Sequence, residues 1–186
     1  ERRTRGRAPA LTEIGLGASQ LGNLYREVDD DTALATVNSA WDAGIRYFDT
    51  APHYGLGLSE RRLGDALSTR PRDEFVLSTK AGRLLVEDPD GLERPDDDGF
   101  AVTSTLRRQW DFTRDGILRS VEDSLRRLRT DRIDVVYLHD PDEHWDAAST
   151  TGVGALIELR DQGVVSAIGA GMNQSAMLAK FVRRCD

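Results

Sequence analysis

The 186-residue sequence contains one cysteine, no long hydrophobic run and no excess of basic residues. The single cysteine, Cys185, excludes an internal disulfide framework and indicates a reducing compartment such as the cytoplasm. No apolar run approaches the roughly 18 residues that a membrane-spanning helix needs, and no signal-peptide core is visible. The formal net charge of -7 gives no support to a nucleic-acid or anionic-membrane partner.

What the sequence does contain is enough apolar content, 39% of its residues, for a hydrophobic core. Its length predicts a single domain over residues 1–186. Strand and helix patterns alternate five times. The expected strands cover residues 14–19, 45–49, 75–80, 133–139 and 164–169. The first expected helix runs from an N-cap among residues 29–31 to Gly44, and the second from Ser59 to just before Pro71. The other three expected helices cover residues 117–128, 153–160 and 175–182. Residues 1–12 are expected to be irregular or to form a small hairpin around Gly6.

This alternation predicts parallel strands joined by right-handed crossovers, because each strand is followed by a helix. The strands are almost wholly apolar, which is typical of a sheet buried on both faces. Either a doubly wound open sheet or a (β/α)8 barrel would fit. A dinucleotide-binding open sheet requires Gly-x-Gly-x-x-Gly, and three candidates lack the third glycine, having Gln20, Glu60 and Gln174 in its place. The barrel is therefore the favoured fold class.

Residues 83–112 form an unusually long connection between the third strand and its helix, and we expect a lid or binding loop there. The acidic run of residues 96–98 is expected to be a solvated surface. Trp110 and Phe112 are predicted either to anchor the next helix or to line a pocket.

Reactive side chains stand at the ends of three successive strands: Asp49 with Tyr54, then Lys80, then His139. The carboxyl ends of the strands of a barrel share one face, so these groups are expected to converge. A lysine at the end of an apolar strand needs a partner, and Asp49 is the natural one. An ammonium beside the phenol of Tyr54 favours the phenolate and makes the phenol usable in proton transfer. His139 would then orient a substrate oxygen.

These segments resemble the aldo-keto reductase family of nicotinamide-dependent (β/α)8 barrels. The match rests on residues 49–55 (Asp-Thr-Ala-Pro-His-Tyr-Gly), 78–80 (Ser-Thr-Lys), 137–139 (Tyr-Leu-His) and 168–169 (Ile-Gly). The resemblance implies a catalytic tetrad of Asp49, Tyr54, Lys80 and His139, with the tyrosine as proton donor or base and hydride passing to or from NADP or NAD. It also implies that Gly17, Ala18, Asp49, Gly171 and Asn173 contact the cofactor.

A finer resemblance concerns the substrate. Residues 41–48, 53–60 and 139–142 are similar to the branch that includes L-fucose and D-threo-aldose 1-dehydrogenases, which oxidise the anomeric carbon of a free sugar. Pyridoxal-oxidising enzymes are similar in the same places. The expected substrate is a sugar or a small aldehyde, with His53, Trp110 and Asp140 as its contacts. A helix-capping or loop-tethering role for Asp140 is the alternative.

The sequence departs from the family pattern in two ways. Many relatives have Ser-Asn after the fifth-strand Ile-Gly-x, whereas this chain has Gly171-Met172 and places Asn173 one residue later. A barrel typically needs about 250 residues, and this sequence ends after five units, as a fragment or a truncated product would. The isolated chain is then expected to bind NAD(P)H poorly, or to self-associate through open sheet edges.

Two other functions are compatible with the same residues. A metal hydrolase would use His139, Asp140 and His144, with His53 as a further ligand, although no established ligand spacing is met. A catalytically inactive or regulatory fragment of the same fold is the second alternative.

Overall fold

The computed structural model describes residues 2–3 and 9–185. Within them, five strands form one parallel sheet in the order β3-β4-β5-β8-β9. The strands are β3 (Leu16–Gly17), β4 (Tyr47–Asp49), β5 (Val76–Ala81), β8 (Val135–His139) and β9 (Ala167–Gly171). The predicted parallel pairing is confirmed. The boundaries differ most at the first strand, which is only two residues long, and at the fifth, which begins three residues later than predicted.

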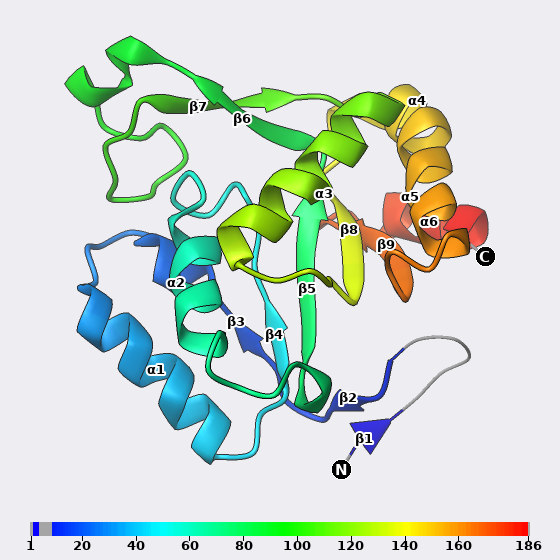
Figure 1. Cartoon of the computed structure of the whole chain (residues 1–186). Helices are drawn as coiled ribbons and strands as arrows, with labels where there is room; N and C mark the ends of the chain where they lie inside the picture. The colour runs from blue at the N-terminus through cyan, green and yellow to red at the C-terminus, as the bar shows by residue number, and fades with distance from the viewer. Residues whose placement is uncertain (1, 4–8, 186) are drawn as a thin grey trace.

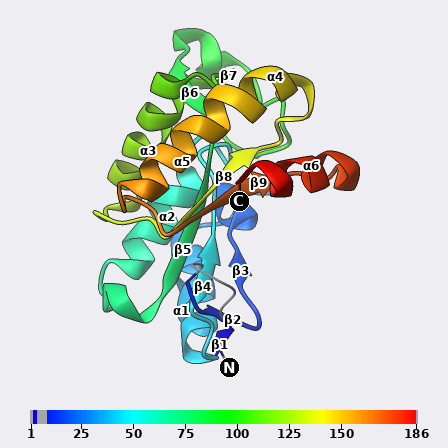
Figure 2. The ribbon, with the colours of Figure 1, turned by 90° about the vertical axis from the view of Figure 1, so that its right-hand side faces the viewer.

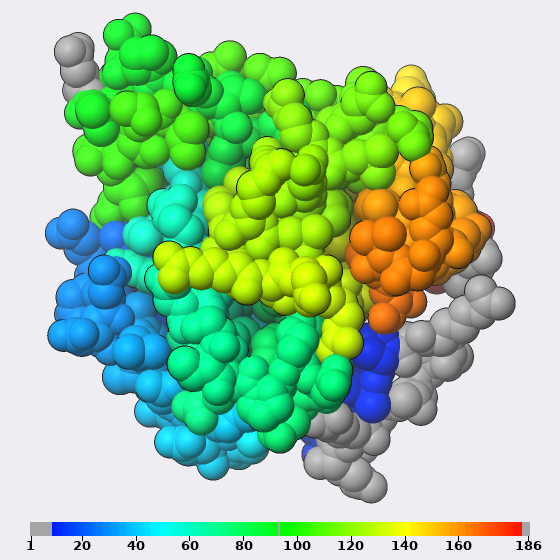
Figure 3. Space-filling view, viewed as in Figure 1, coloured from blue at the N-terminus to red at the C-terminus, as the bar shows by residue number. Residues whose placement is uncertain are grey.

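Helices follow the strands as expected. They are α1 (Asp30–Asp42), α2 (Leu58–Leu67), α3 (Arg114–Leu128), α5 (Val153–Asp161) and α6 (Ser175–Cys185), with a short α4 (Trp145–Ala147) and a π turn, η5 (Ala148–Gly152), extending α5 backwards. Figure 2 shows α1, α2, α3 and α5 on one side of the sheet. In the space-filling view they pack against one another over this face (Figure 3). None of the described helices is long and apolar enough to cross a bilayer.

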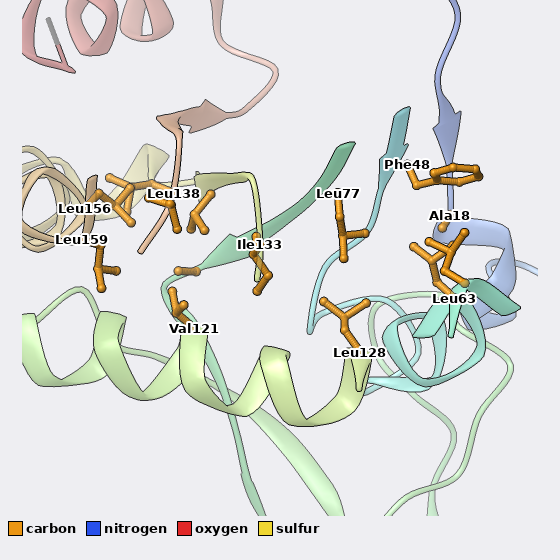
Figure 4. Close-up of a cluster of buried hydrophobic side chains, with 14 of the residues drawn as sticks. Ala18, Phe48, Leu63, Leu77, Val121, Leu128, Ile133, Leu138, Leu156 and Leu159 are labelled. Carbon is orange, nitrogen blue, oxygen red and sulfur yellow. The ribbon is translucent and has the colours of Figure 1, made fainter. Parts of the chain in front are cut away.

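The hydrophobic core lies between this helical layer and the sheet (Figure 4). Alternate strand residues point to opposite faces, so Phe48, Leu77 and Leu138 meet the helices and are at most 2% exposed. Their strand neighbours Lys80 and His139 point to the other face, which in a closed barrel is the interior. Strand alternation therefore separates the packing residues from the chemically reactive ones.

Caps and turns explain where two helices begin. Asp29 caps α1 as predicted, because its carboxylate accepts a hydrogen bond from the Thr32 amide at 2.7 Å. The predicted cap of α2, Ser59, is wrong. The helix begins at Leu58 after Gly57, whose φ of 83° suits glycine. The Ser59 hydroxyl is buried instead and donates to the Ala18 carbonyl at 2.6 Å.

The long connection after β5 is not an irregular loop. It contains an antiparallel hairpin of β6 (Arg83–Glu87) and β7 (Leu106–Trp110), joined through the 3-10 turn η3 (Pro89–Glu93) and residues 94–105. Figure 1 shows this hairpin above the carboxyl ends of the strands.

At the opposite end, β1 (Arg2–Arg3) pairs antiparallel with β2 (Leu11–Thr12), so a hairpin is confirmed there, although Gly6 lies outside the described residues. Two further 3-10 turns, η1 (Ser19–Gly22) and η4 (Asp142–His144), follow β3 and β8, and a third, η2 (Arg72–Glu74), precedes β5.

A buried ion pair joins α2 to α3 behind the sheet. The Glu60 side chain is fully buried, accepts a hydrogen bond from Arg127 at 2.5 Å and another from the Thr79 hydroxyl at 2.6 Å. Thr79 precedes Lys80 in β5, so this contact fixes the strand that carries the lysine. A buried carboxylate depends on such partners because its desolvation is costly.

We therefore expect Arg127→Ala to lower the free energy of unfolding by about 3 kcal/mol, because it leaves the Glu60 carboxylate buried without its cation. Urea unfolding followed by circular dichroism measures the change. The matched control is Arg126→Ala on the same helix. Arg126 is mostly exposed and pairs only with exposed or partly exposed acids, so its loss should cost less than about 1 kcal/mol. Equal losses in the two variants would contradict the prediction.

Candidate active site

The carboxyl ends of β4, β5 and β8 open into one pocket with a volume of about 430 Å³. The register of the sheet produces this arrangement, since it pairs Asp49 with Ser78 and Lys80 with Tyr137. The pocket is lined by Ser19, Leu24, His53, Tyr54, Lys80, Asp98, Phe100, His139, Asp140, Gly171, Met172 and Asn173. The residues predicted to converge are thus brought together at one edge of the sheet.

Lys80 lies at the centre of the site and is only 8% exposed. Its Nζ donates to Asp49 Oδ2 at 2.7 Å and to the Thr50 carbonyl at 2.9 Å, so the expected ion pair is present. Nζ also lies 4.9 Å from the centroid of the Tyr54 ring. Burial lowers the pKa of Lys80, but the Asp49 carboxylate and the Tyr54 phenol outweigh burial and leave the pKa above its ordinary value. Lys80 is therefore a cation at neutral pH.

The Asp49 carboxylate is held from below by polar groups on the same face of the sheet. Ser78 Oγ donates to Asp49 Oδ1 at 2.6 Å and lies 3.1 Å from the Tyr47 hydroxyl. The Tyr47 and Tyr137 hydroxyls are 3.3 Å apart. Burial, followed by the contact with Tyr47, raises the pKa of Tyr137. Tyr137 thus stays a neutral phenol beneath the ion pair.

A close backbone contact positions Tyr54. Its neighbour Gly55 has a φ of 61°, and a Cβ there would lie 2.2 Å from the Gly22 carbonyl oxygen. Glycine alone fits, because any side chain would collide with backbone that cannot move freely. This contact presses the loop after β4 against the loop after β3. The Tyr54 ring consequently faces Lys80 and lies 5.7 Å from the His139 ring, edge to face.

Two histidines form the next part of the pocket. His139 is 4% exposed, and its ring lies 5.2 Å from that of His53. Burial, then the nearby charge of Arg83, lowers the pKa of both, for His53 to about 3 and for His139 well below its ordinary value. Both imidazoles are therefore neutral at pH 7. His139 Nδ1 is buried and has no hydrogen-bond partner within the described part of the chain.

Sequence reasoning missed Arg83, whose side chain contacts residues at or after the ends of β4, β7 and β8. Its Nη2 donates to Asp140 Oδ2 at 2.7 Å, its Nη1 lies 3.1 Å from His53 Nδ1, and its guanidinium lies over the Trp110 ring at 4.1 Å. Asp140 has a φ of 39°, which directs the chain into this contact. The position of Arg83 three residues beyond Lys80, just past a strand end, was the available signal.

The residues predicted to contact the cofactor and the substrate fall into two groups. Gly171 and Asn173 line the pocket, as do His53 and Asp140 among the predicted substrate contacts. A Cβ on Gly171 would lie 3.3 Å from Lys80 Cε, so glycine lets this strand end lie directly against the lysine side chain. Asn173 is the amide side chain on this wall that a nicotinamide carboxamide would meet.

Four other predicted residues are not among those that line the pocket. One of them, Asp49, reaches the site through its ion pair with Lys80. Gly17 pairs with Asp49 in the sheet and is exposed. Ala18 is 1% exposed, its amide donates to the Asp49 carbonyl and its carbonyl accepts from Ser59, so it has no free group for a cofactor. Trp110 stacks on Phe112 at 5.7 Å and reaches the site only through Arg83. The sequence predicts that Trp110 and Phe112 either anchor the next helix or line a pocket, and their contact with each other agrees better with the anchoring role.

The metal-site alternative finds little support in these positions. His144 lies against the Trp110 and Phe112 rings, at 4.8 and 5.5 Å. Among the side chains that the structure describes, no group of three histidines, cysteines or acids is placed to hold a metal ion.

Comparison with known proteins places the chain in a family. Residues 13–183 match the model of the Aldo/keto reductase family, and the chain belongs to that family. It is 53% identical to a D-threo-aldose 1-dehydrogenase from Pseudomonas sp over 95% of this chain and 55% of that protein. It is 36% identical to pyridoxal 4-dehydrogenase from Microbacterium luteolum over 100% of this chain and 59% of that protein.

The fold agrees with solved structures of the same family. The holo form of an aldo-keto reductase from Bacillus halodurans superimposes with a TM-score of 0.77 at 28% identity, covering 100% of this chain and 55% of that one. The chain spans little more than half the length of these relatives. Its five strand–helix units are thus the first five of a (β/α)8 barrel of the aldo-keto reductase type.

The lowered histidine pKa values predict a pH dependence of stability. Between about pH 6.5 and pH 3 the unfolded chain binds protons on His53 and His139 that the folded chain does not bind, so the free energy of unfolding should fall as the pH falls through this window. The upper bound is about 1.4 kcal/mol per pH unit for each histidine. Urea unfolding from pH 7 to pH 5 measures the slope, and His53→Asn should reduce it.

Nuclear magnetic resonance gives a second readout of the same prediction. The imidazole carbon-bound protons of His53 and His139 should keep the shifts of the neutral form from pH 8 to pH 5. A midpoint above pH 6 for either ring would contradict the assignment of neutral histidines.

Proposed function

We propose that this chain carries the catalytic half of an NAD(P)-dependent aldose 1-dehydrogenase, with Asp49, Tyr54, Lys80 and His139 as its catalytic residues. The single observation that supports this most is the position of the Lys80 ammonium. Its Nζ lies 2.7 Å from Asp49 Oδ2 and 4.9 Å from the centroid of the Tyr54 ring, and the neutral His139 imidazole lies beside that ring. A phenol next to a fixed cation can exchange a proton with a substrate hydroxyl. Residues 1–186 act as one domain in this proposal.

Each residue has a chemical role in the oxidation. Gly171 and Asn173 would hold a nicotinamide cofactor, NADP or NAD, which would supply the hydride acceptor for the carbon that is oxidised. Tyr54, as phenolate, takes the proton of the hydroxyl on that carbon, so that an aldose yields its lactone. Lys80 stabilises the phenolate, and Asp49 holds Lys80 in place. His139 is neutral and so forms a hydrogen bond to the same substrate oxygen without adding charge.

The substrate class rests on the pocket and on the relatives together. The 53% identity to a D-threo-aldose 1-dehydrogenase supports a free sugar such as L-fucose, and Asp140 and His53 offer polar groups to its hydroxyls. Pyridoxal is the second candidate substrate, because pyridoxal 4-dehydrogenase is 36% identical over the whole chain. The cofactor-facing residues in this proposal are Gly171 and Asn173.

Two further parts of the proposal concern the protein's surroundings. The single cysteine remains the basis for expecting a cytoplasmic, reducing environment. Strands β3 and β9 are the outer strands of the described sheet, so self-association through these edges remains a prediction.

The direct test is Tyr54→Phe in the protein that carries this sequence. We expect kcat for NAD(P)-dependent oxidation of L-fucose to fall at least about 100-fold, because the ring keeps its place while the acid–base group is lost. NAD(P)H binding, followed by fluorescence, should be unchanged. Tyr25→Phe is the matched control, since Tyr25 is 84% exposed and is not among the residues that line the pocket. Retention of more than a tenth of the activity in Tyr54→Phe would overturn the proposed role.

A further inference from the structure

One wall of the pocket comes from residues 96–101, which belong to the connection between β6 and β7. This segment is docked on the loop after β3: Phe100 forms a bridge with Leu24, the Ala101 amide donates to the Asn23 carbonyl at 2.8 Å, and Asn23 Nδ2 donates back to the Ala101 carbonyl at 3.2 Å. The wall is therefore held by backbone pairing and is part of the folded structure.

Arg108 on β7 fastens the same segment from the other side. Its Nη1 contacts Asp96 Oδ2 at 2.5 Å and Asp98 Oδ2 at 2.9 Å, and its Nη2 donates to the His53 carbonyl at 2.9 Å. The Asp96 side chain is 2% exposed, so its carboxylate serves the contact with Arg108 and does not face solvent. One guanidinium thus ties the acidic segment to the loop that carries Tyr54.

This docking brings two side chains of the wall to the reactive groups. Phe100 is 4% exposed, and its ring lies 6.0 Å from the Tyr54 ring and 5.2 Å from the His53 ring. Asp98 lines the pocket while its side chain remains 44% exposed. Of the acidic run expected to be a solvated surface, Asp97 is exposed as expected, whereas the Asp96 side chain is buried and Asp98 lines the pocket.

The charges around the pocket are paired. Of the described cations in or beside it, Lys80 is paired with Asp49, Arg83 with Asp140, and Arg108 with Asp96 and Asp98. No cation of this group is left to neutralise an anionic substrate. A carboxylate or phosphate on the substrate would meet Asp98 and Asp140 as like charges. Carboxylate oxygens are strong acceptors for hydroxyl donors, so the same pair suits a neutral polyhydroxy compound.

We propose that Asp98 is a specificity-determining residue that accepts hydrogen bonds from substrate hydroxyls, and that together with Asp140 it selects neutral polyhydroxy substrates over acidic ones. This inference rests on the proposed function, since it assigns the substrate class of the same pocket.

The experiment measures steady-state oxidation of L-fucose and of D-galacturonate by the protein that carries this sequence. The wild type should strongly prefer L-fucose, and Asp98→Ala should raise KM for L-fucose about tenfold with kcat changed less than twofold, because one hydroxyl loses its acceptor. The same variant should improve the relative kcat/KM for D-galacturonate, since the like charge of Asp98 no longer opposes the substrate carboxylate. Asp97→Ala removes the same charge from the neighbouring exposed residue and should change neither constant.

Three results would overturn the inference. They are an unchanged KM in Asp98→Ala, an equal effect in Asp97→Ala, and a wild type that prefers D-galacturonate. Thermal unfolding of each variant shows whether a raised KM comes from lost structure, and a lowered Tm in Asp98→Ala alone, with kcat reduced equally, would also count against a substrate contact. A wild type that oxidises no aldose would contradict the proposed function itself, and the sugar assignment of Asp98 with it.

Discussion

The geometry of the site depends on the need of one buried ammonium for a partner. Removing a charge from water costs several kcal/mol, and the cost is recovered only with good geometry and hydrogen bonds to the remaining positions. Lys80 meets this condition through Asp49 and the Thr50 carbonyl, both on the adjacent strand end. The parallel register between β4 and β5 thus sets the position of Lys80, and the phenol and the imidazole are arranged around it.

This much could be predicted from the sequence, because it follows from topology. Apolar strands alternating with amphipathic helices indicate a parallel sheet, and the carboxyl ends of parallel strands meet at one edge. Asp49, Lys80 and His139 each end such a strand, so their convergence needed no knowledge of side-chain packing. The helix boundaries at Asp29 were equally local, since a cap depends on residues three positions away.

The parts that were missed depend on contacts between distant residues. The β6–β7 hairpin joins strands separated by residues 88–105, and β7 (Leu-Arg-Arg-Gln-Trp) lacks the apolar alternation that marks a strand. Arg83 contacts His53 and Asp140, which are 30 and 57 residues away in the sequence. The acidic run at 96–98 has the composition of a solvated surface, and only the position of Arg108 reveals that Asp96 is buried. Composition alone cannot show which member of a charged cluster faces inward.

The charge pairing and the neutral histidines have a common physical basis. Burial, and then the nearby charges of Arg83, Lys80 and Arg108, lowers the pKa of both imidazoles, so both rings stay neutral. The three cations are in turn compensated by carboxylates. The pocket therefore presents many donors and acceptors with little uncompensated charge. Such a site favours a substrate that has many hydroxyls and no charge. A charged substituent would lose its hydration on binding, and no unpaired charge of opposite sign in the described part of the pocket would compensate for that loss.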